Sequence, residues 1–273
     1  MRELEDKVAI ITGAGRGIGA AAAVLFAEHG ARIVVADLDI AVAQETVELI
    51  RQNNGTAIAV LCDVTNPEHI QRLINESVRQ FGQIDILVNN AGFTWDGMVH
   101  KMSDEQWEAI LNVHLTAPFR IIRAVVPYLR DQAKREIEQT GAALPRKIIN
   151  VSSTTGTRGK VGQINYAAGK AGIIGLTKTL AKEWGAFNIQ VNVVAYGMID
   201  TRLTQPKDGE RYTERAGTRV DLGIPQEMRE TAIKTIPMGR PGTAEEAAGV
   251  LYFFASPYSN YVSGQVIEVT GGL

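Results

Sequence analysis

Two kinds of segment alternate along the chain, as judged from the spacing of its hydrophobic positions. Short runs rich in β-branched residues alternate with longer segments in which apolar residues recur every three or four positions. The first pattern is typical of buried strands and the second of amphipathic helices. The predicted strands are Val8–Thr12, Arg32–Ala36, Ala57–Cys62, Ile84–Val88, Lys147–Val151, Gln190–Ala195 and Gln265–Val269. The predicted helices are Gly17–His29, Ile40–Asn53, Pro67–Phe81, Ser103–Arg130, Tyr166–Trp184 and Ala244–Ala255.

This alternation also predicts how the elements are arranged. Strand, helix and strand in succession form a right-handed unit with parallel strands in nearly all cases. Strands that are almost continuously apolar indicate a parallel sheet covered on both faces. We therefore expect an α/β fold: a single doubly wound Rossmann-type domain over residues 1–273, with a seven-stranded parallel sheet flanked by helices on both faces.

Two segments interrupt the alternation. Asp131–Pro145 is polar and is expected to extend the preceding helix into solvent before the chain returns to the sheet. Thr201–Pro237 is longer and rich in proline and glycine, and it follows the sixth strand, at the edge where open sheets bind ligands. We interpret residues 201–237 as a substrate lid. The alternative is an ordinary surface loop without a role in binding.

Composition narrows the classes of function. Hydrophobic residues make up 45% of the 273 residues and charged residues 21%, which is ordinary for a globular protein. A formal net charge of −2 provides no basic field for nucleic acid or anionic lipid, so neither is an expected partner. No apolar run approaches the ~20 residues of a membrane span, and the charged N-terminus is unlike a signal peptide. We therefore expect a cytoplasmic protein.

Thiol and metal chemistry are not expected. Cys62 is the only cysteine, which excludes an internal disulfide, and its place at the end of a predicted strand favours a buried structural thiol. The four histidines, His29, His69, His100 and His114, fit no metal-ligand spacing. No bound metal is predicted.

A glycine-rich segment joins the first predicted strand to the first predicted helix. Glycines at such a junction let the backbone approach a pyrophosphate, which the N–H groups of the helix N-terminus then face. Glycines alone are a weak indication because any tight turn can use them, but strand, turn and helix follow here in the order typical of dinucleotide sites. The cofactor-binding residues predicted in this turn are Gly13, Gly15, Arg16, Gly17, Ile18 and Gly19.

The end of the second predicted strand indicates which nicotinamide cofactor is used. Asp37 can accept hydrogen bonds from the adenosine ribose and would repel the 2′-phosphate of NADP, by about 4 kcal/mol at ~4 Å and an effective dielectric of about 20. NAD(H) is therefore preferred. Arg16 can hold a 2′-phosphate, which keeps NADP(H) as an alternative, and Asp37 can also simply cap a helix. Asp63, with Val64 beside it, would meet the adenine or only cap a turn.

Several further motifs resemble those of the short-chain dehydrogenase/reductase family, over essentially the whole chain. Motifs in the right order are far more specific than any one alone. They are the Thr12–Gly19 turn, Asn89-Asn90-Ala91-Gly92, Asn112, Ser153 and Tyr166-Ala167-Ala168-Gly169-Lys170. The similarity is greatest to the 3-oxoacyl-acyl-carrier-protein reductases of this family, through Asn150-Val151-Ser152-Ser153, Gly162-Gln163-Ile164-Asn165-Tyr166 and Thr270-Gly271-Gly272.

The resemblance implies positions for residues around the cofactor. Asn90 would lie against the adenosine ribose side, and Ile199 and Thr201 would meet the nicotinamide carboxamide. The chain departs from the family at Tyr196-Gly197, where Pro-Gly is usual, so the ring that would fix the backbone beside the nicotinamide is absent.

Tyr166 and Lys170 are the expected proton-transfer pair. Four residues apart at the start of a predicted helix, they share one helix face. The Lys170 ammonium, with the positive nicotinamide of the oxidised cofactor, is expected to lower the tyrosine pKa from ~10 toward neutrality. Tyr166 would then donate a proton to a carbonyl oxygen held by Ser153 while hydride arrives from the nicotinamide. Lys170 would also bind the nicotinamide ribose, and Asn112 would tie a water to Lys170.

Each of these four residues also has an ordinary structural explanation. A tyrosine and a lysine four apart are usually an exposed helix pair, a serine can end a turn, and an asparagine can bond its own helix backbone. Behind a dinucleotide turn, the four together favour catalysis.

Three functions remain open at this point. The first is reduction of a 3-oxoacyl thioester, or oxidation of the 3-hydroxyacyl thioester. The second is NAD-dependent oxidation of a cyclic or other secondary alcohol, which Asp37 supports because biosynthetic reductases of the family commonly use NADPH. The third is a non-catalytic dinucleotide sensor. The resemblance also implies a homotetramer or homodimer, with the helices around Ser103–Arg130 and Tyr166–Trp184 at the contact.

Overall fold

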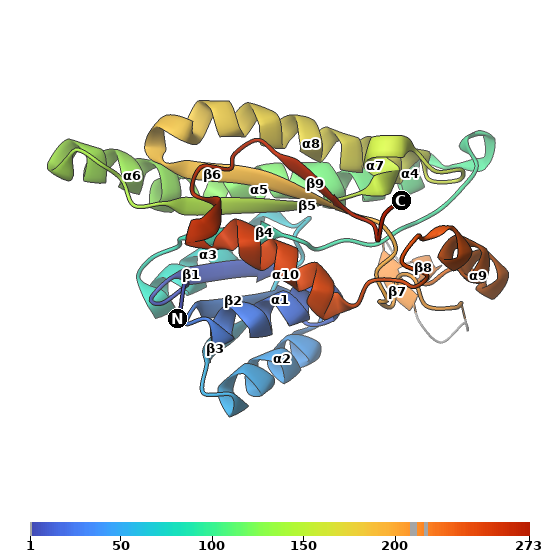
Figure 1. Cartoon of the computed structure of the whole chain (residues 1–273), viewed down its shortest axis with the longest axis horizontal. Helices are drawn as coiled ribbons and strands as arrows, with labels where there is room; N and C mark the ends of the chain where they lie inside the picture. The colour runs from blue at the N-terminus through green and yellow to red at the C-terminus, as the bar shows by residue number, and fades with distance from the viewer. Residues whose placement is uncertain (1, 208–211, 216–217) are drawn as a thin grey trace.

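One parallel sheet organises the molecule (Figure 1). The computed structural model describes residues 2–207, 212–215 and 218–273. Seven strands form the main sheet in the order β3-β2-β1-β4-β5-β6-β9, and every neighbouring pair is parallel. Their bounds are β1 Val8–Thr12, β2 Arg32–Asp37, β3 Thr56–Leu61, β4 Ile86–Asn89, β5 Arg146–Ser153, β6 Ile189–Tyr196 and β9 Val266–Val269. The seven-stranded Rossmann-type sheet predicted from the sequence is confirmed.

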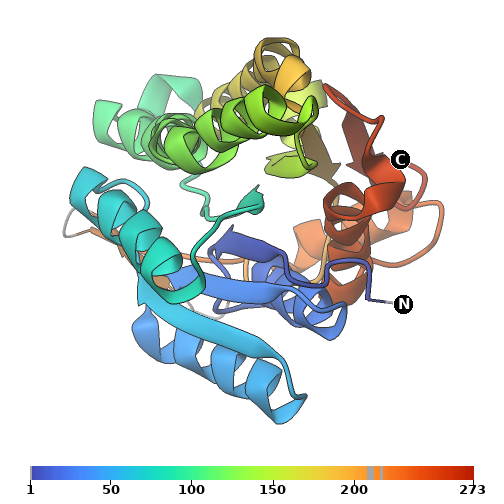
Figure 2. The same ribbon diagram turned by 90° about the vertical axis from the view of Figure 1, so that its left-hand side faces the viewer.

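The helices cover both faces of this sheet, as predicted (Figure 2). Apolar residues of α1, α2 and α10 belong to one hydrophobic core, and apolar residues of α3 to α6 and α8 belong to the other. In Figure 2, α2 and α3 lie on opposite sides of β3. The bounds are α1 Gly17–Glu28, α2 Ile40–Gln52, α3 Pro67–Phe81, α4 Asp104–Leu111, α5 Ala117–Ala124, α6 Val126–Thr140, α7 Thr154–Arg158, α8 Ile164–Trp184, α9 Gln226–Thr235 and α10 Ala244–Ala255.

The central strands are apolar on both sides because alternate residues serve different cores. In β1, Ala9 and Ile11 belong to the core under α1 and α10, while Val8 and Ile10 belong to the core on the other face. Side chains alternate across a strand with a period of two, so a strand inside a doubly covered sheet needs apolar residues at every position. This requirement explains the unbroken hydrophobic runs in the sequence.

The segment predicted as one helix over Ser103–Arg130 is interrupted. Ser103 caps α4 by accepting a hydrogen bond from the Gln106 backbone N–H, and the Gln106 side-chain oxygen accepts one from the Ser103 backbone N–H, which forms a capping box. A π-helical turn, Asn112–Thr116, separates α4 from α5. The single predicted helix is therefore wrong in detail, because an extra residue in one turn is invisible to a count of helical periods.

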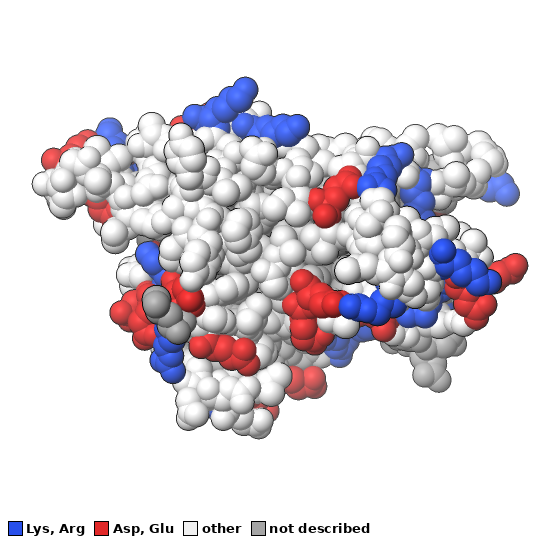
Figure 3. Space-filling model, in the orientation of Figure 1, with Lys and Arg blue, Asp and Glu red and all other residues white. Residues whose placement is uncertain are grey.

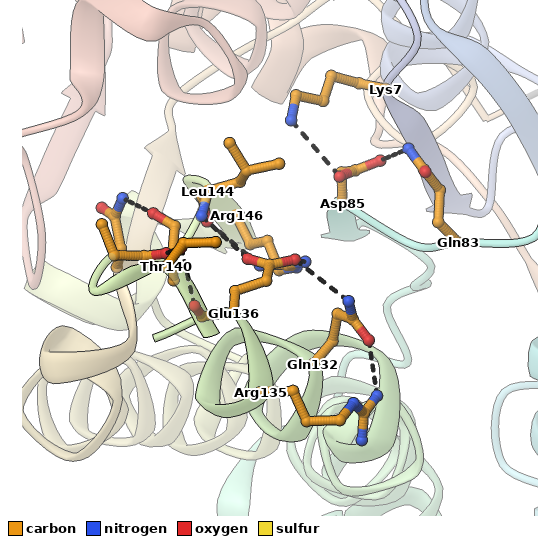
Figure 4. Close-up of polar contacts among 12 residues, drawn as sticks. Lys7, Gln83, Asp85, Gln132, Arg135, Glu136, Thr140, Leu144 and Arg146 are labelled. Carbon is orange, nitrogen blue, oxygen red and sulfur yellow. Dashed lines mark hydrogen bonds and ion pairs between the residues drawn. The ribbon is translucent and has the colours of Figure 1, made fainter. Parts of the chain in front are cut away.

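The helix α6 continues to Thr140, and it is tied back to the sheet rather than simply projecting into solvent (Figure 4). Glu136 accepts hydrogen bonds from both terminal nitrogens of Arg146, at 2.6 and 3.0 Å. Arg146 begins β5, and its side chain is only 5% exposed. The Arg146 guanidinium lowers the pKa of Glu136 to about 2. An ion pair thus fixes the polar segment that joins α6 to β5.

We expect Glu136→Gln to lower the free energy of unfolding by about 2 kcal/mol at neutral pH, since it leaves a buried guanidinium without its anion. A carboxyl whose pKa falls on folding stabilises the protein above its unfolded pKa of ~4.3 and loses that contribution as the pH falls through its folded pKa. The difference from the wild type should therefore shrink between about pH 4 and pH 2. Chemical denaturation across this range measures it. Glu138→Gln, which removes an exposed pair with Lys134 on the same helix, should change little, and equal losses in both variants would contradict the assignment.

Residues 201–237 contain ordered elements of their own. They include the antiparallel hairpin of β7 Tyr212–Arg215 and β8 Thr218–Asp221, followed by α9. The parts of the predicted lid at residues 208–211 and 216–217 lie outside the described residues. The hairpin and α9 lie together beside the carboxyl ends of the central strands (Figure 1). The assignment of this segment as a lid stays a prediction.

The face shown in Figure 3 carries both acidic and basic side chains, which are interspersed around a broad uncharged area. Neither sign of charge dominates this face. Among the described helices, none alone has the length and apolarity needed to cross a membrane. One bent pair, Asp104–Ala124 with Val126–Thr140, passes that test by length and composition.

Candidate active site

A cavity of about 350 Å³ lies at the carboxyl ends of the strands, where doubly wound sheets bind dinucleotides. Its walls come from the glycine-rich turn, the ends of β2, β3 and β4, and the segment after β6. The residues that contribute are Gly13, Arg16, Gly17, Ile18, Asp37, Leu38, Asp39, Val42, Cys62, Asp63, Val64, Thr65, Asn90, Ala91, Gly92, Phe93, Val113, Thr201, Arg202, Leu203, Tyr212, Thr213 and Leu222. Most of the predicted cofactor-binding residues therefore share one cavity.

The glycine-rich turn fits a pyrophosphate. Gly13 and Gly17 have φ of +62° and +58°, which only glycine adopts readily. A Cβ on Gly19 would lie 2.3 Å from the Gly13 carbonyl oxygen, and one on Gly15 would lie 2.5 Å from Val42 Cγ2. No side chain caps the N-terminus of α1, and its first turn contains no acidic residue. Its N–H groups and the positive end of its dipole are therefore available to an anion.

Asp37 holds this turn in place. Its Oδ2 accepts a hydrogen bond from the Gly15 N–H at 2.9 Å, and its Oδ1 accepts one from the Asp39 N–H at 3.1 Å. Asp39, and not Asp37, caps α2, so the explanation of Asp37 as a helix cap is wrong. Arg16 pairs with Asp39 at 3.8 Å, which sets a carboxylate beside the guanidinium that could hold a 2′-phosphate. Two carboxylates thus border the adenosine end of the cavity.

Asp63, Val64 and Asn90 line the cavity. The side chains of Asp63 and Asn90 also form hydrogen bonds with nearby backbone groups. Asp63 Oδ1 accepts hydrogen bonds from the N–H and hydroxyl of Thr65, at 2.9 and 2.7 Å, as expected of a turn cap. The Asn90 side-chain nitrogen donates to the carbonyl oxygens of Thr12 and Gly13, at 2.9 and 3.0 Å. Asn90 therefore fastens the glycine-rich turn to the end of β4, and its amide nitrogen is already used.

The segment after β6 supplies Thr201 but not Ile199 to the cavity wall. The Ile199 side chain is 4% exposed and belongs to the hydrophobic core. Tyr196, which stands in place of the family's proline, is buried and donates its hydroxyl hydrogen to the Ala247 carbonyl oxygen at 2.7 Å. This bond anchors the end of β6 to α10. A tertiary hydrogen bond thus restrains the backbone where a proline ring would otherwise do so.

Ser153, Tyr166 and Lys170 lie together, although none of the three lines this cavity. Ser153 ends β5, and its hydroxyl oxygen accepts a hydrogen bond from the Thr155 N–H at 3.1 Å. Its side chain also lies close enough to Tyr166 to lower the pKa of the tyrosine. Lys170 lies one turn further along α8, with its Nζ 5.6 Å from the centre of the tyrosine ring. The Lys170 Nζ also donates to the Val151 carbonyl oxygen at 2.7 Å, and the side chain is almost fully buried. The tyrosine and lysine are therefore not an exposed helix pair.

Two motif residues next to Tyr166 build the wall around it. The buried Gln163 donates to both carboxylate oxygens of Asp96 at 3.0 Å, and it accepts from the Thr155 hydroxyl at 3.2 Å. Asn165 donates to the carbonyl oxygens of Trp95 and Gln106, both at 3.1 Å. The start of α8 is thereby fixed against the loop that follows β4 and against α4.

Burial dominates the protonation of the tyrosine–lysine pair. It raises the pKa of Tyr166 to about 12, although the hydrogen bond from Ser153 lowers it, and it lowers the pKa of Lys170 to about 7. These directions are opposite to the predicted activation of Tyr166 by Lys170. The reason is that both charged forms lose hydration, so the protein alone does not stabilise the phenolate. The positive nicotinamide of an oxidised cofactor would supply the missing charge.

Asn112 follows α4 and begins the π-helical turn, and among the described residues its side chain forms no hydrogen bond. Its predicted contact with Lys170 through a water stays a prediction. His114, two residues later, packs edge-on against the Tyr166 ring, with centroids 4.9 Å apart and planes at 88°. The histidines were considered only as metal ligands in the sequence. No pattern there indicates His114, because its position depends on the π-helical turn.

Comparison with known proteins agrees with this geometry. A family model described as enoyl-(acyl carrier protein) reductase matches residues 13–273. A 3-oxoacyl-acyl-carrier-protein reductase of Thermotoga maritima is 41% identical over 270 residues, which cover 99% of this chain and 98% of the relative. Reductases of the same name from Vibrio cholerae and Escherichia coli K12 are 38% and 35% identical, over 99% and 98% of this chain and 98% of each relative. The chain belongs to the short-chain dehydrogenase/reductase family.

As a member of the short-chain dehydrogenase/reductase family, the protein is a nicotinamide-dependent oxidoreductase that acts on a carbonyl or the corresponding secondary alcohol. The predicted family, fold and enzyme class are confirmed. The choice between NAD and NADP, the substrate and the roles of individual residues are proposals.

Proposed function

We propose that the protein reduces a 3-oxoacyl thioester to the 3-hydroxyacyl thioester with NADH. The observation that carries the proposal is the cluster of Tyr166, Ser153 and Lys170, which packs through His114 against Gly92 in the wall of a cavity that fits a dinucleotide. Support for the substrate comes from the relatives named 3-oxoacyl-acyl-carrier-protein reductases, which align over 98% of their own length.

The chain's own groups perform the proton chemistry in this proposal. A bound nicotinamide supplies the hydride to the carbonyl carbon. Ser153 donates a hydrogen bond to the carbonyl oxygen, and Tyr166, which is protonated because burial raises its pKa to about 12, gives that oxygen its proton. Lys170 is held by the Val151 carbonyl oxygen, and its remaining N–H groups bind the nicotinamide ribose and stabilise the phenolate left on Tyr166.

The cofactor preference in this proposal rests on charge. Asp37 and Asp39 both line the adenosine end of the cavity, and Arg16 is paired with Asp39. A 2′-phosphate would meet two carboxylates there, whereas ribose hydroxyls can donate to Asp37. NAD(H) is the proposed cofactor, and NADP(H) is the alternative.

A second candidate function is oxidation of a cyclic or other secondary alcohol by NAD. The same acidic adenosine end favours it, because NAD-linked enzymes commonly work in the oxidative direction. A non-catalytic dinucleotide sensor is the third candidate, and Tyr166, Ser153 and Lys170 in one cluster oppose it.

A substrate panel separates these functions. Purified protein is assayed with acetoacetyl thioesters of acyl carrier protein and of pantetheine, with cyclic ketones, and with the matching alcohols, each with both cofactors, by nicotinamide absorbance. The thioesters should give a kcat/KM at least tenfold above the ketones. A preference for cyclic substrates supports the second function, and binding of NADH without any turnover supports the sensor and overturns the proposal.

The surroundings of the site complete the proposal. Tyr212, Thr213 and Leu222 of the 201–237 segment line the cavity, which supports a role for this segment as a lid.

The protein is still predicted to form a homotetramer or a homodimer, with contacts through residues 103–130 and 166–184. Light scattering tests this assembly. The cytoplasmic location also stays a prediction.

A further inference from the structure

Lys147 occupies a position where the alternation of side chains along β5 calls for an apolar residue. It is the second residue of that strand, and Ile149, two positions later on the same face of the sheet, belongs to the core under α1 and α10. Lys147 is nonetheless only 3% exposed. Lysine is almost never fully buried unless its charge is paired, so this ammonium calls for an anion.

The hydrogen-bond partners of Lys147 are neutral. Its Nζ donates to Ser259 Oγ at 3.1 Å and to Asn260 Oδ1 at 2.8 Å. Both residues belong to the segment after α10, where Ser259 ends the 3₁₀ helix Pro257–Ser259. An ammonium has three N–H groups, so one of them has no partner among the described residues. No described carboxylate forms an ion pair with Lys147, which leaves its charge unneutralised.

Lys7 brings a second cation to the same place. Burial, and secondarily the charge of Lys7, lowers the pKa of Lys147 to about 8, so most of it is still protonated at neutral pH. The Lys7 Nζ lies 3.5 Å from Asp85 Oδ1 (Figure 4). The other oxygen of Asp85 accepts from the Val8 N–H at 2.9 Å and from the Gln83 amide at 2.7 Å. One carboxylate, already shared in this way, neutralises only one of the two ammonium groups.

A small cavity of about 30 Å³ is lined by both lysines and by Asn260. A space of about 10–15 Å³ already holds one water, so this cavity has room for one or two particles of that size but not for a metabolite. A halide ion is comparable in size to a water molecule. Most of the other walls are apolar, and they come from Leu4, Ile86, Pro145, Ala255 and Pro257.

Glu3 is the one carboxylate among the described residues that line this cavity, and its oxygens are already engaged. Its Oε2 accepts from the Tyr252 hydroxyl at 2.8 Å and contacts His29 Nδ1 at 2.8 Å. Its Oε1 accepts from the Tyr258 hydroxyl at 3.3 Å. These partners lie on α10, at the end of α1 and in the segment after α10. Glu3 therefore serves a different cluster and does not pair with Lys147.

We propose that this cavity is a binding site for a small monovalent anion such as chloride, which contacts the Lys147 ammonium and supplies the negative charge that the chain itself lacks there. Buried charges in proteins are paired, and breaking such a pair is strongly destabilising. Lys147 pairs with Ile86 where β5 and β4 begin, at the opposite edge of the sheet from the cofactor cavity. The anion thus stabilises the contact between β5 and the segment after α10, independently of the proposed function.

Thermal unfolding in sodium chloride and in sodium gluconate, at neutral pH and equal ionic strength, tests this site. Gluconate is also a monovalent anion, but it is far too large for the cavity. A ligand that binds only the folded state raises the melting temperature, and we expect chloride to raise it by roughly 2–4 °C over gluconate. Bromide should act as chloride does. Lys147→Met keeps most of the side-chain stem but removes the charge, and it should abolish the difference between the salts.

The matched control is Lys134→Met. It removes an exposed ammonium, which pairs with Glu138 on α6, and so changes the net charge by the same amount. This variant should keep the full effect of chloride. Equal melting temperatures of the wild type in the two salts would overturn the proposal. A chloride effect of the same size in Lys147→Met would do so too, because it would be a general effect of the salt.

A crystal of the wild-type protein soaked in sodium bromide gives a readout that needs no variant. Anomalous scattering should place a bromide ion in contact with the Lys147 Nζ. A water at this position, or bromide only elsewhere on the surface, rejects the proposal even if Lys147→Met does not fold. Because neither experiment measures turnover, their outcome is independent of the substrate panel, and either proposal can fail alone.

Discussion

Replacement of Tyr166 with phenylalanine should lower kcat by roughly 10³-fold and leave the Kd for NADH almost unchanged. Positioned proton donors contribute about 10²- to 10⁴-fold to a rate, and phenylalanine keeps the ring that packs on His114 while it removes the hydroxyl whose pKa Ser153 lowers. Single-turnover reduction of the best panel substrate measures the loss, and quenching of protein fluorescence measures NADH binding.

The control for this prediction is Tyr252→Phe. Tyr252 also donates its hydroxyl hydrogen to a side chain, Glu3 at 2.8 Å, but it lies on α10, away from the cavity. Its removal should lower the free energy of unfolding by about 1 kcal/mol without affecting kcat. Unchanged turnover in Tyr166→Phe would end the assignment of Tyr166 as the proton donor.

The second large effect is expected at Asp37. Asp37→Ala removes the carboxylate that would repel a 2′-phosphate, and about 4 kcal/mol of repulsion corresponds to nearly 10³-fold in the ratio of kcat/KM for NADPH over NADH. The same change also frees the Gly15 N–H, which Asp37 now binds at 2.9 Å. We therefore expect kcat/KM to rise with NADPH and to fall with NADH.

Asp37→Asn separates charge from hydrogen bonding. Its side-chain oxygen can still accept from Gly15, so the turn is kept while the negative charge is removed. If repulsion sets the preference, Asp37→Asn should gain NADPH use as Asp37→Ala does but lose less with NADH. A ratio of kcat/KM that is the same in the wild type and both variants would contradict the role of Asp37 in cofactor choice.

The fold was readable from the sequence because each element carries its own signal. The unbroken apolar runs at β1 and β6 require burial on both sides, and the order of strands and helices leaves little freedom in a parallel sheet. The glycine-rich turn was equally plain, since the positive φ of Gly13 and Gly17 excludes most other residues. Ser153, Tyr166 and Lys170 were found because their motif has fixed spacing.

The remainder of the site depended on contacts between distant segments. Whether Asp37 caps α2 or binds the turn is decided by Asp39, which performs the capping. The packing of His114 against Tyr166 depends on the π-helical turn that contains the histidine. The pKa directions of Tyr166 and Lys170 follow from burial, which a helical spacing of four residues does not reveal.

By itself, then, the sequence determined the doubly wound sheet and the glycine-rich turn, because local periodicity and backbone constraints encode them. It also singled out Ser153, Tyr166 and Lys170, through their resemblance to a family motif. Only the tertiary structure decided which carboxylate holds the turn, how Tyr196 anchors β6 without a proline, and which buried ring supports the tyrosine. Those outcomes depend on packing between elements far apart in the chain. Desolvation and hydrogen-bond partners are properties of that packing and not of any local pattern.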